Sequence, residues 1–359
     1  AYTAIDDSEA YFQVGLYTGT GSLQAITLPG DTDMQPDLVW SKSRSNATSQ
    51  NIADAVRGVT KVLEADATTA EATNANSLTA FGSDGFTVGT DAGWNGSSRT
   101  FVAWNWKANG SGSSNSDGSI TATVSADTTS GFSIVSYTGT GSNASFGHGL
   151  GVMPTAVIIK RTDTTSSWVV MSGGSRDSAP YDFFGSYDYY LALNTTAAGS
   201  GALATGDNRT STNSSSTYFN IGTDAVVNAS SGTYIAYCFA DISGYSKMGS
   251  YIGNGSADGT FVYTGFRPAF VMVKKTLYAA AWQIQDIKRN TYNPADTSLF
   301  ANDTDADTTS SGYATDFLSN GFKLRGTTTA RNESGENYIY MAFAEAPFVN
   351  SNGVPCNAR

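Results

Sequence analysis

The chain has 359 residues, a formal net charge of −11 and a pI near 4.5. Such an acidic chain lacks the basic face that nucleic-acid binding requires, and it does not favour docking to an anionic membrane surface. Charged residues make up only 14%, whereas Gly contributes 38 residues and Tyr and Phe together contribute 37 (19 + 18). This composition, rich in turn and strand formers, predicts a soluble all-β protein.

A six-residue stretch near the start of the chain occurs three times. "YTGTGS" stands at residues 17–22 and again at 137–142, and "YIGNGS" stands at 251–256. Each copy precedes a proline, an apolar run and a lysine six residues after that proline: Pro36 and Lys42, Pro154 and Lys160, Pro268 and Lys274. Self-similarity of this kind indicates a repeated structural unit.

The rest of the unit is also repeated in order. A short segment ends on Arg57, Arg176 or Arg289. A turn motif follows ("SDGFTVG" in the first copy), and then an aromatic strand ("FVAWNWKA", "YIAYCFAD" and "YIYMAFAE"). Segment 52–73 has a helical composition, but its alignment with the strand-like parts of the other copies favours strands. We therefore expect three tandem pseudo-repeats, each an antiparallel β-sandwich of the concanavalin or jelly-roll kind.

Composition places the expected boundaries. Repeat 1 covers residues 1–110, repeat 2 covers 111–242, repeat 3 covers 243–349, and a tail covers 350–359. The Gly/Ser-rich stretch 109–119 is predicted to be a linker or exposed loop. The second boundary, near 241–247, is short, so repeats 2 and 3 are expected to pack closely.

No catalytic residues and no cofactor are predicted. The single histidine, His148, argues against a Ser-His-Asp triad and a multi-histidine zinc site, and we expect it to lie in a turn. "GTGS" lacks the phosphate-loop pattern and is expected to be a turn. Asp303, Asp305 and Asp307 begin like a calcium loop but lack its Gly and Glu, so a solvated acidic loop is preferred to a weak surface cation site.

Other polar residues have structural interpretations. Asp54 with Arg57, and Asp286 with Arg289, share one spacing that predicts a structural ion pair rather than catalysis. Cys238 and Cys356 are expected to be free thiols. Asn-x-Ser/Thr patterns at Asn46, Asn95, Asn194 and Asn332 arise by chance in such a composition, with glycosylation as the alternative.

The aromatic residues divide into two groups. The tryptophans at strand positions are expected in the core: Trp40, Trp104, Trp106, Trp168 and Trp282. A second group lies in loop-like sequence and forms the candidate ligand or interface site: Trp94, Tyr181, Tyr187, Tyr189 and Tyr190. Exposed aromatics there would serve a protein interface or stack on a glycan, with a purely structural role as the remaining alternative.

Taken together, "YTGTGS", "PDLVWSKSR", "DAVRG", "SDGFTVG" and "FVAWNWKA" resemble a repeat family of bacteriophage virion proteins common in marine and cyanobacterial phages. The resemblance extends over nearly the whole chain. It implies a structural or adhesive virion component with lectin-like sandwich domains, such as a tail-fibre, head-fibre or decoration protein. It brings no catalytic residues.

The function expected from the sequence is therefore non-enzymatic. The chain would be a structural subunit on the virion surface that assembles with other virion proteins and with copies of itself. The alternatives are a carbohydrate-binding adhesin for a host-surface glycan and a glycosylated extracellular filament subunit.

Overall fold

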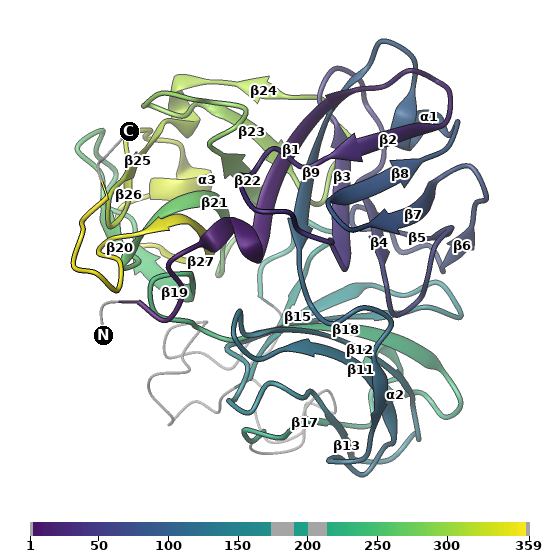
Figure 1. The fold of residues 1–359 in the computed structure, drawn as a ribbon. Coiled ribbons are helices and arrows are strands. Elements are labelled where there is room, and N and C mark those ends of the chain that lie inside the picture. The colour runs from purple at the N-terminus through teal and green to yellow at the C-terminus, as the bar shows by residue number, and fades with distance from the viewer. Residues whose placement is uncertain (1–2, 174–189, 200–213, 357–359) are drawn as a thin grey trace.

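The computed structural model describes residues 3–173, 190–199 and 214–356. The described chain is all-β, with several antiparallel sheets and only single turns of helix, which confirms the predicted class (Figure 1). No helix among the described residues is long and apolar enough to span a membrane.

The strands separate into three groups, here called lobes, because no sheet among the described residues joins strands of two groups. Lobe 1 holds β1 (Phe12–Thr18), β2 (Gln24–Thr27), β3 (Leu38–Ser43), β4 (Asn51–Asp54), β5 (Lys61–Glu64), β6 (Ala72–Thr73), β7 (Leu78–Gly82), β8 (Gly85–Val88) and β9 (Thr100–Trp106). Lobe 2 holds β10 (Ser113–Asn115), β11 (Ala122–Asp127), β12 (Phe132–Thr138), β13 (Ala144–Gly147), β14 (Ala156–Arg161), β15 (Trp168–Ser172), β16 (Leu191–Ala192), β17 (Tyr218–Ile221) and β18 (Thr233–Phe239). Lobe 3 holds β19 (Ser246–Ile252), β20 (Phe261–Tyr263), β21 (Phe266–Lys275), β22 (Gln283–Asp286), β23 (Thr297–Phe300), β24 (Thr308–Thr309), β25 (Thr315–Leu318), β26 (Gly321–Leu324) and β27 (Asn337–Pro347).

Short helices complete the elements: 3-10 turns η1 (Ser8–Ala10) and η2 (Ser311–Tyr313), and α1 (Ala92–Asn95), α2 (Ala225–Asn228) and α3 (Thr329–Asn332). One α-helical turn belongs to each lobe. It directly precedes the long aromatic strand, which is β9, β18 or β27.

The large sheets of the three lobes share one strand order. Five strands of each sheet run in equivalent order: β1-β9-β3-β4-β5 in lobe 1, β12-β18-β14-β15-β16 in lobe 2 and β19-β27-β21-β22-β23 in lobe 3. Further edge strands are β6 in lobe 1, β10 and β11 in lobe 2, and β24 in lobe 3. A smaller sheet pairs β2 with β8, β13 with β17 and β20 with β26. This common order defines equivalent positions, which the strand registers fix: Trp104, Tyr237 and Met341 occupy one such position, and Asp54, Ser172 and Asp286 occupy another.

The central strands of the large sheets are buried on both faces. Every residue of β3 is buried, as are all but the first residue of β9 and of β18. One face packs on the small sheet of its own lobe, and the other packs against the other lobes in one shared core. Two-sided burial explains the nearly continuous apolar runs in "TAVIIK" and "YIAYCF", which a sandwich with one face in water would replace by alternation.

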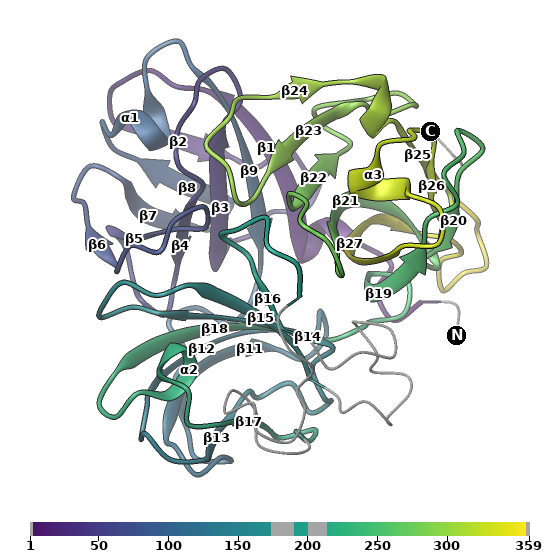
Figure 2. The same cartoon turned by 180° about the vertical axis from the view of Figure 1, so that it is seen from behind.

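The shared core lies where the three lobes meet, and Figures 1 and 2 show the lobes arranged around that centre. Three aromatic rings form a triangle at equivalent positions of β9, β18 and β27: Trp106, Phe239 and Phe343. Their centroids are 6.3 Å (Trp106 to Phe239), 5.4 Å (Trp106 to Phe343) and 5.7 Å (Phe239 to Phe343) apart. Such aromatic contacts add to the burial of apolar area.

The structure tests several local predictions made from the sequence. The span 52–73 holds strands β4, β5 and β6, so the strand assignment is confirmed. The expected linker 109–119 is wrong in part, because β10 within it pairs with β11 at the edge of the large sheet. The predicted tail, residues 350–359, contacts the start of the chain, because the Ser351 backbone N–H donates to the Asp6 carboxylate at 2.7 Å. The division into separate domains stays a prediction, because all three lobes contribute to one core.

We predict that Phe343→Ala lowers the free energy of unfolding by about 3–5 kcal/mol, because it opens a cavity in the shared core. Trp106→Phe should cost much less. The Trp106 indole N–H has no partner among the described residues, so its removal offsets the smaller ring. Urea unfolding measures both variants, and an equal loss in the two would contradict this account of the triangle.

Candidate functional site

The repeated "YTGTGS" stretch encloses an asparagine of its own lobe. The last residue of each short helix is a buried asparagine: Asn95, Asn228 and Asn332. In lobe 2, the Asn228 side-chain oxygen accepts the Thr140 N–H at 2.7 Å, and its amide nitrogen donates to the Ser142 and Gly222 carbonyl oxygens. Lobes 1 and 3 repeat these bonds. The glycine-rich loop therefore binds part of the chain itself, which confirms the turn and disfavours a phosphate site.

Two glycines in this loop have separate physical reasons. A Cβ on Gly139 would lie 2.4 Å from the Ala229 carbonyl oxygen, so the helix end leaves no room for a side chain. Gly141 has φ +74°, a left-handed conformation that glycine adopts readily. The equivalent glycines of lobes 1 and 3 show the same two properties.

The same asparagines answer the glycosylation question for two of the sequons. Asn95 and Asn332 are buried with both amide hydrogens engaged, and Asn194 is buried with its oxygen accepting the Trp168 N–H. Of the four positions named from the sequence, only Asn46 is exposed. The recurrence of "N-x-S" just before each aromatic strand was the available signal for this loop, but the Ser- and Asn-rich composition obscured it.

We predict that Gly139→Ala destabilises the chain by about 1–3 kcal/mol, as overpacking against a backbone oxygen does. Gly82→Ala is the matched control, because its Cβ would meet only ordinary contacts, the nearest at 3.4 Å. Urea titration of the two variants measures the difference. A Gly139→Ala chain as stable as the control would show that the loop does not need this close approach.

The three lysines found through their spacing from proline lie between lobes. Lys42, Lys160 and Lys274 are completely buried. Each donates to a threonine carbonyl oxygen of another lobe: Lys42 to Thr304 (2.9 Å), Lys160 to Thr68 (3.1 Å) and Lys274 to Thr196 (3.4 Å). Lobe 1 thus donates to lobe 3, lobe 2 to lobe 1, and lobe 3 to lobe 2, which closes a ring.

Other hydrogen bonds follow the same cyclic direction. The same three threonine oxygens accept backbone N–H groups of the donor lobes, from Thr48 (2.9 Å), Ser166 (2.8 Å) and Ala280 (2.9 Å). A side chain beside each lysine also donates to the next lobe: Gln50 to the Phe300 oxygen (2.7 Å), Trp168 to the Glu64 oxygen (2.8 Å) and Trp282 to the Ala192 oxygen (2.9 Å). We call these contacts, with the lysines, the interlobe ring.

The predicted Asp–Arg pairs are confirmed and also belong to interfaces between lobes. Asp54 lies 2.5 Å from Arg57, and Asp286 lies 2.6 Å from Arg289. Tyr237 of lobe 2 donates to Asp54 at 2.8 Å, and Trp104 of lobe 1 donates to Asp286 at 3.1 Å. Both carboxylates are therefore used inside the protein.

The third interface has different residues at the equivalent described positions. Where the other two interfaces have an aspartate and an aromatic donor, the interface between lobes 2 and 3 has Ser172 and Met341. Joint replacement avoids a buried carboxylate without a partner, which is strongly destabilising.

We predict a rise in stability with pH that comes from the lysines. Burial lowers the pKa of Lys42, Lys160 and Lys274 from the ordinary 10.5 to about 8. Between these values the unfolded chain binds more protons through these lysines, so the free energy of unfolding increases as pH rises from about 8 to 9. Above pH 9 the Cys238 thiol and the buried tyrosines oppose the trend, because burial raises the pKa of Cys238, Tyr137 and Tyr237 above the values of the unfolded chain.

Urea unfolding at several pH values checks this. Lys160→Met should remove roughly a third of the rise, since one of three similar groups is lost. Lys247→Met, at an exposed lysine, serves as the control. A flat or falling profile between pH 8 and 9 in the unsubstituted chain would contradict buried lysines with a lowered pKa.

A pocket of about 330 Å³ opens in lobe 1 between β4, β5, the segment leading to β6, and α1. Polar groups from both walls line it, among them Asn51, Glu64, Asn74 and Asp91. Asp91 caps α1 by accepting the Gly93 N–H and also accepts the Asn74 side-chain amide, both at 2.8 Å. Glu64 accepts the Thr69 hydroxyl at 2.9 Å. The two carboxylates are thus held in place before any ligand arrives.

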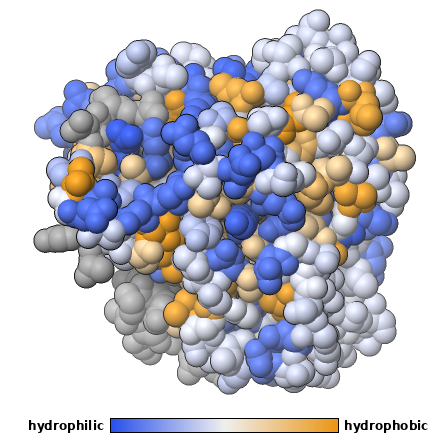
Figure 3. Space-filling model, in the orientation of Figure 1, coloured by the Kyte–Doolittle hydropathy of each residue, from blue (hydrophilic) through white to orange (hydrophobic). Residues whose placement is uncertain are grey.

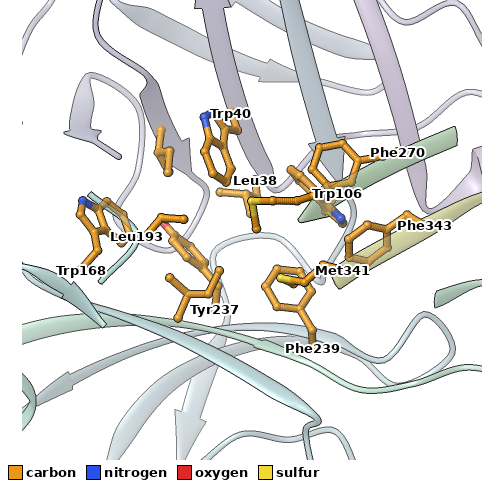
Figure 4. A pocket seen from close by; sticks show the side chains of 13 residues that line it. Leu38, Trp40, Trp106, Trp168, Leu193, Tyr237, Phe239, Phe270, Met341 and Phe343 are labelled. Carbon is orange, nitrogen blue, oxygen red and sulfur yellow. The ribbon is translucent and has the colours of Figure 1, made fainter. Parts of the chain in front are cut away.

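The second pocket is the core itself. Its 13 lining residues come from all three lobes and enclose only about 20 Å³, and Figure 4 shows their side chains converging, among them Trp106, Phe239 and Phe343. All the lining side chains are hydrophobic, and a void of this size has room for nothing beyond a water-sized group. It is a packing defect of the core rather than a binding site.

The candidate aromatic residues do not form one exposed cluster. Trp94 is only 1% exposed and belongs to the core of lobe 1, so the expectation of an exposed ring is wrong, although the residue lines the 330 Å³ pocket. Its short helix, capped by Asp91 and anchored by Asn95, turns the ring inward. Tyr181, Tyr187 and Tyr189 lie outside the described residues, and Tyr190 is half-buried against the core of lobe 2.

The remaining candidates are structural. Asp307 pairs with Arg44 (2.8 Å) and Arg289 (3.0 Å), and no metal-binding group of three appears among the described residues. His148 is buried directly after β13, where its ring lies 3.2 Å from the Ser215 carbonyl oxygen, and burial lowers its pKa. Cys238 and Cys356 are free, as predicted, and burial raises the pKa of Cys238 to about 12.

The fold and these contacts define an all-β protein. Its buried lysines between lobes, and Asp54 and Asp286, form hydrogen bonds that join one lobe to another. The chain belongs to the family described as "Domain of unknown function (DUF7483)", whose match covers residues 7–347 and so includes all three lobes. No curated protein matches the sequence.

Proposed function

We propose that this chain is a non-enzymatic structural component of a bacteriophage virion, built from three tandem copies of one antiparallel sandwich unit. The interlobe ring carries the proposal. Its equivalent hydrogen bonds, made in one cyclic direction, join each lobe to the next. Such hydrogen bonds between lobes suit a subunit that must keep one arrangement of its lobes in a particle.

The buried charged groups support the same function. The lysines and the two aspartates between lobes are committed to internal hydrogen bonds, so none is free to act on a substrate. The proposed location in a virion rests on the resemblance of the repeated motifs to phage virion proteins. Assembly with copies of itself and with other virion proteins follows as part of the proposal.

The exposed surface is compatible with protein assembly. Figure 3 shows hydrophobic residues scattered in small groups among hydrophilic ones on one face. On β19 and β20, three apolar side chains remain largely exposed: Ile252, Phe261 and Tyr263. Three of the four sequons named from the sequence are buried, but Asn46 and the further sequons at Asn109, Asn143 and Asn254 are exposed, so a glycosylated filament subunit stays an alternative.

Electron microscopy of particles tests the proposal. Particles made without the chain should lack a surface density, and particles carrying a peptide tag at Gly110 should show label there. Gly110 suits the tag because its surroundings are open. Unchanged particles without the chain, together with no label on tagged particles, would refute a virion role.

A further inference from the structure

The pocket in lobe 1 has no open equivalent in the other described lobe regions. Asn51, Glu64 and Trp94 occupy positions where lobe 2 has Val169, Ala192 and Val227 and lobe 3 has Gln283, Phe300 and Arg331. In lobe 2 these residues are apolar. In lobe 3 the buried Arg331 side chain crosses this face of the sheet and donates to Gln285 and to the Tyr313 oxygen. Among the described parts of the three lobes, lobe 1 combines polar walls here with a pocket of about 330 Å³.

The polar groups of the pocket are mainly hydrogen-bond acceptors. Asn51 is 6% exposed, and its amide nitrogen donates to the Ser49 and Gly93 oxygens, which leaves its side-chain oxygen as an acceptor facing the pocket. Glu64 and Asp91 add carboxylate oxygens from opposite walls. No Lys, Arg or His is among the described lining residues.

The rest of the lining is mixed. Val62, Ala70 and Ala72 contribute apolar side chains and Trp94 an indole ring, and Ser49 and Thr69 add hydroxyl groups. A ligand that fits must therefore donate several hydrogen bonds, carry no negative charge and present an apolar patch. A volume of about 330 Å³ is within the range of small-molecule sites.

We infer that this pocket binds one ring of a neutral or amino-bearing sugar. The ring hydroxyls donate to Asn51, Glu64 and Asp91, and the C–H face of the ring packs on Ala70 and Ala72. An amino group in place of a hydroxyl forms a charge-assisted bond with a carboxylate and binds more tightly. Uronic acids and sugar phosphates are repelled by the two carboxylates. The inference of a sugar site does not depend on the virion role, so a negative result for sugar binding would leave the virion proposal unchanged.

Ligand-observed NMR and calorimetry with the full chain test the site. The probes are glucose, galactose, N-acetylglucosamine, glucosamine and glucuronate. At least one neutral or amino sugar should bind with a Kd on the order of 1 mM, as expected for a small polar ligand. Glucuronate should not bind. No binding by any neutral or amino sugar, or equal binding of glucuronate, overturns the inference.

Variants locate the site. Ala70→Trp fills the pocket without removing a hydrogen bond and should abolish binding. Glu64→Gln keeps the shape and should weaken glucosamine about tenfold through loss of a charge-assisted bond. Asp33→Asn, an exposed acidic residue of the same lobe outside the pocket, makes the same charge change and should leave affinity unchanged. Sugar binding that survives Ala70→Trp, in a chain folded as judged by circular dichroism, contradicts this pocket as the site.

Discussion

The arrangement of the three lobes depends on one interaction, a buried lysine that donates to the backbone of the next lobe. A lysine ammonium is costly to bury unless oxygen atoms surround it. Lys160, for example, obtains those oxygens from Ser166 in its own lobe and from Thr68 in lobe 1. Removing a neighbour would therefore leave the charge without part of its shell. Each lobe supplies an acceptor oxygen to the buried lysine of another lobe, so all three lobes are both donor and acceptor in the ring.

The shared core follows from that closure. Because the ring holds the large sheets facing inward, the central strands of each sheet bury both faces, and Trp106, Phe239 and Phe343 meet at the centre. The lobes differ at individual positions of this common frame. One interface has Ser172 and Met341 where the other two have an aspartate and an aromatic donor, and among the described residues a polar pocket of about 330 Å³ lies beside the short helix of lobe 1.

Local patterns in the sequence predicted local structure well. The proline-to-lysine spacing identified β3, β14 and β21, and the Asp–Arg spacing identified real ion pairs. The roles between lobes could not be predicted, because the Tyr237 partner of Asp54 is far along the chain and only ring closure brings the two together. Trp94 misled for a different reason. Its polar, glycine-containing surroundings are typical of an exposed loop, yet a buried asparagine beside it anchors the segment and turns the ring inward.

The central claim is that the three lobes fold as one unit although each has its own sheets. Differential scanning calorimetry tests this most directly, because the ratio of the calorimetric to the van 't Hoff enthalpy reports how many parts unfold independently. The interlobe ring and the shared core predict a single transition with a ratio near one, at a pH where unfolding is reversible. Separate transitions, or a ratio well above one, would show that the lobes are independent domains and contradict the account.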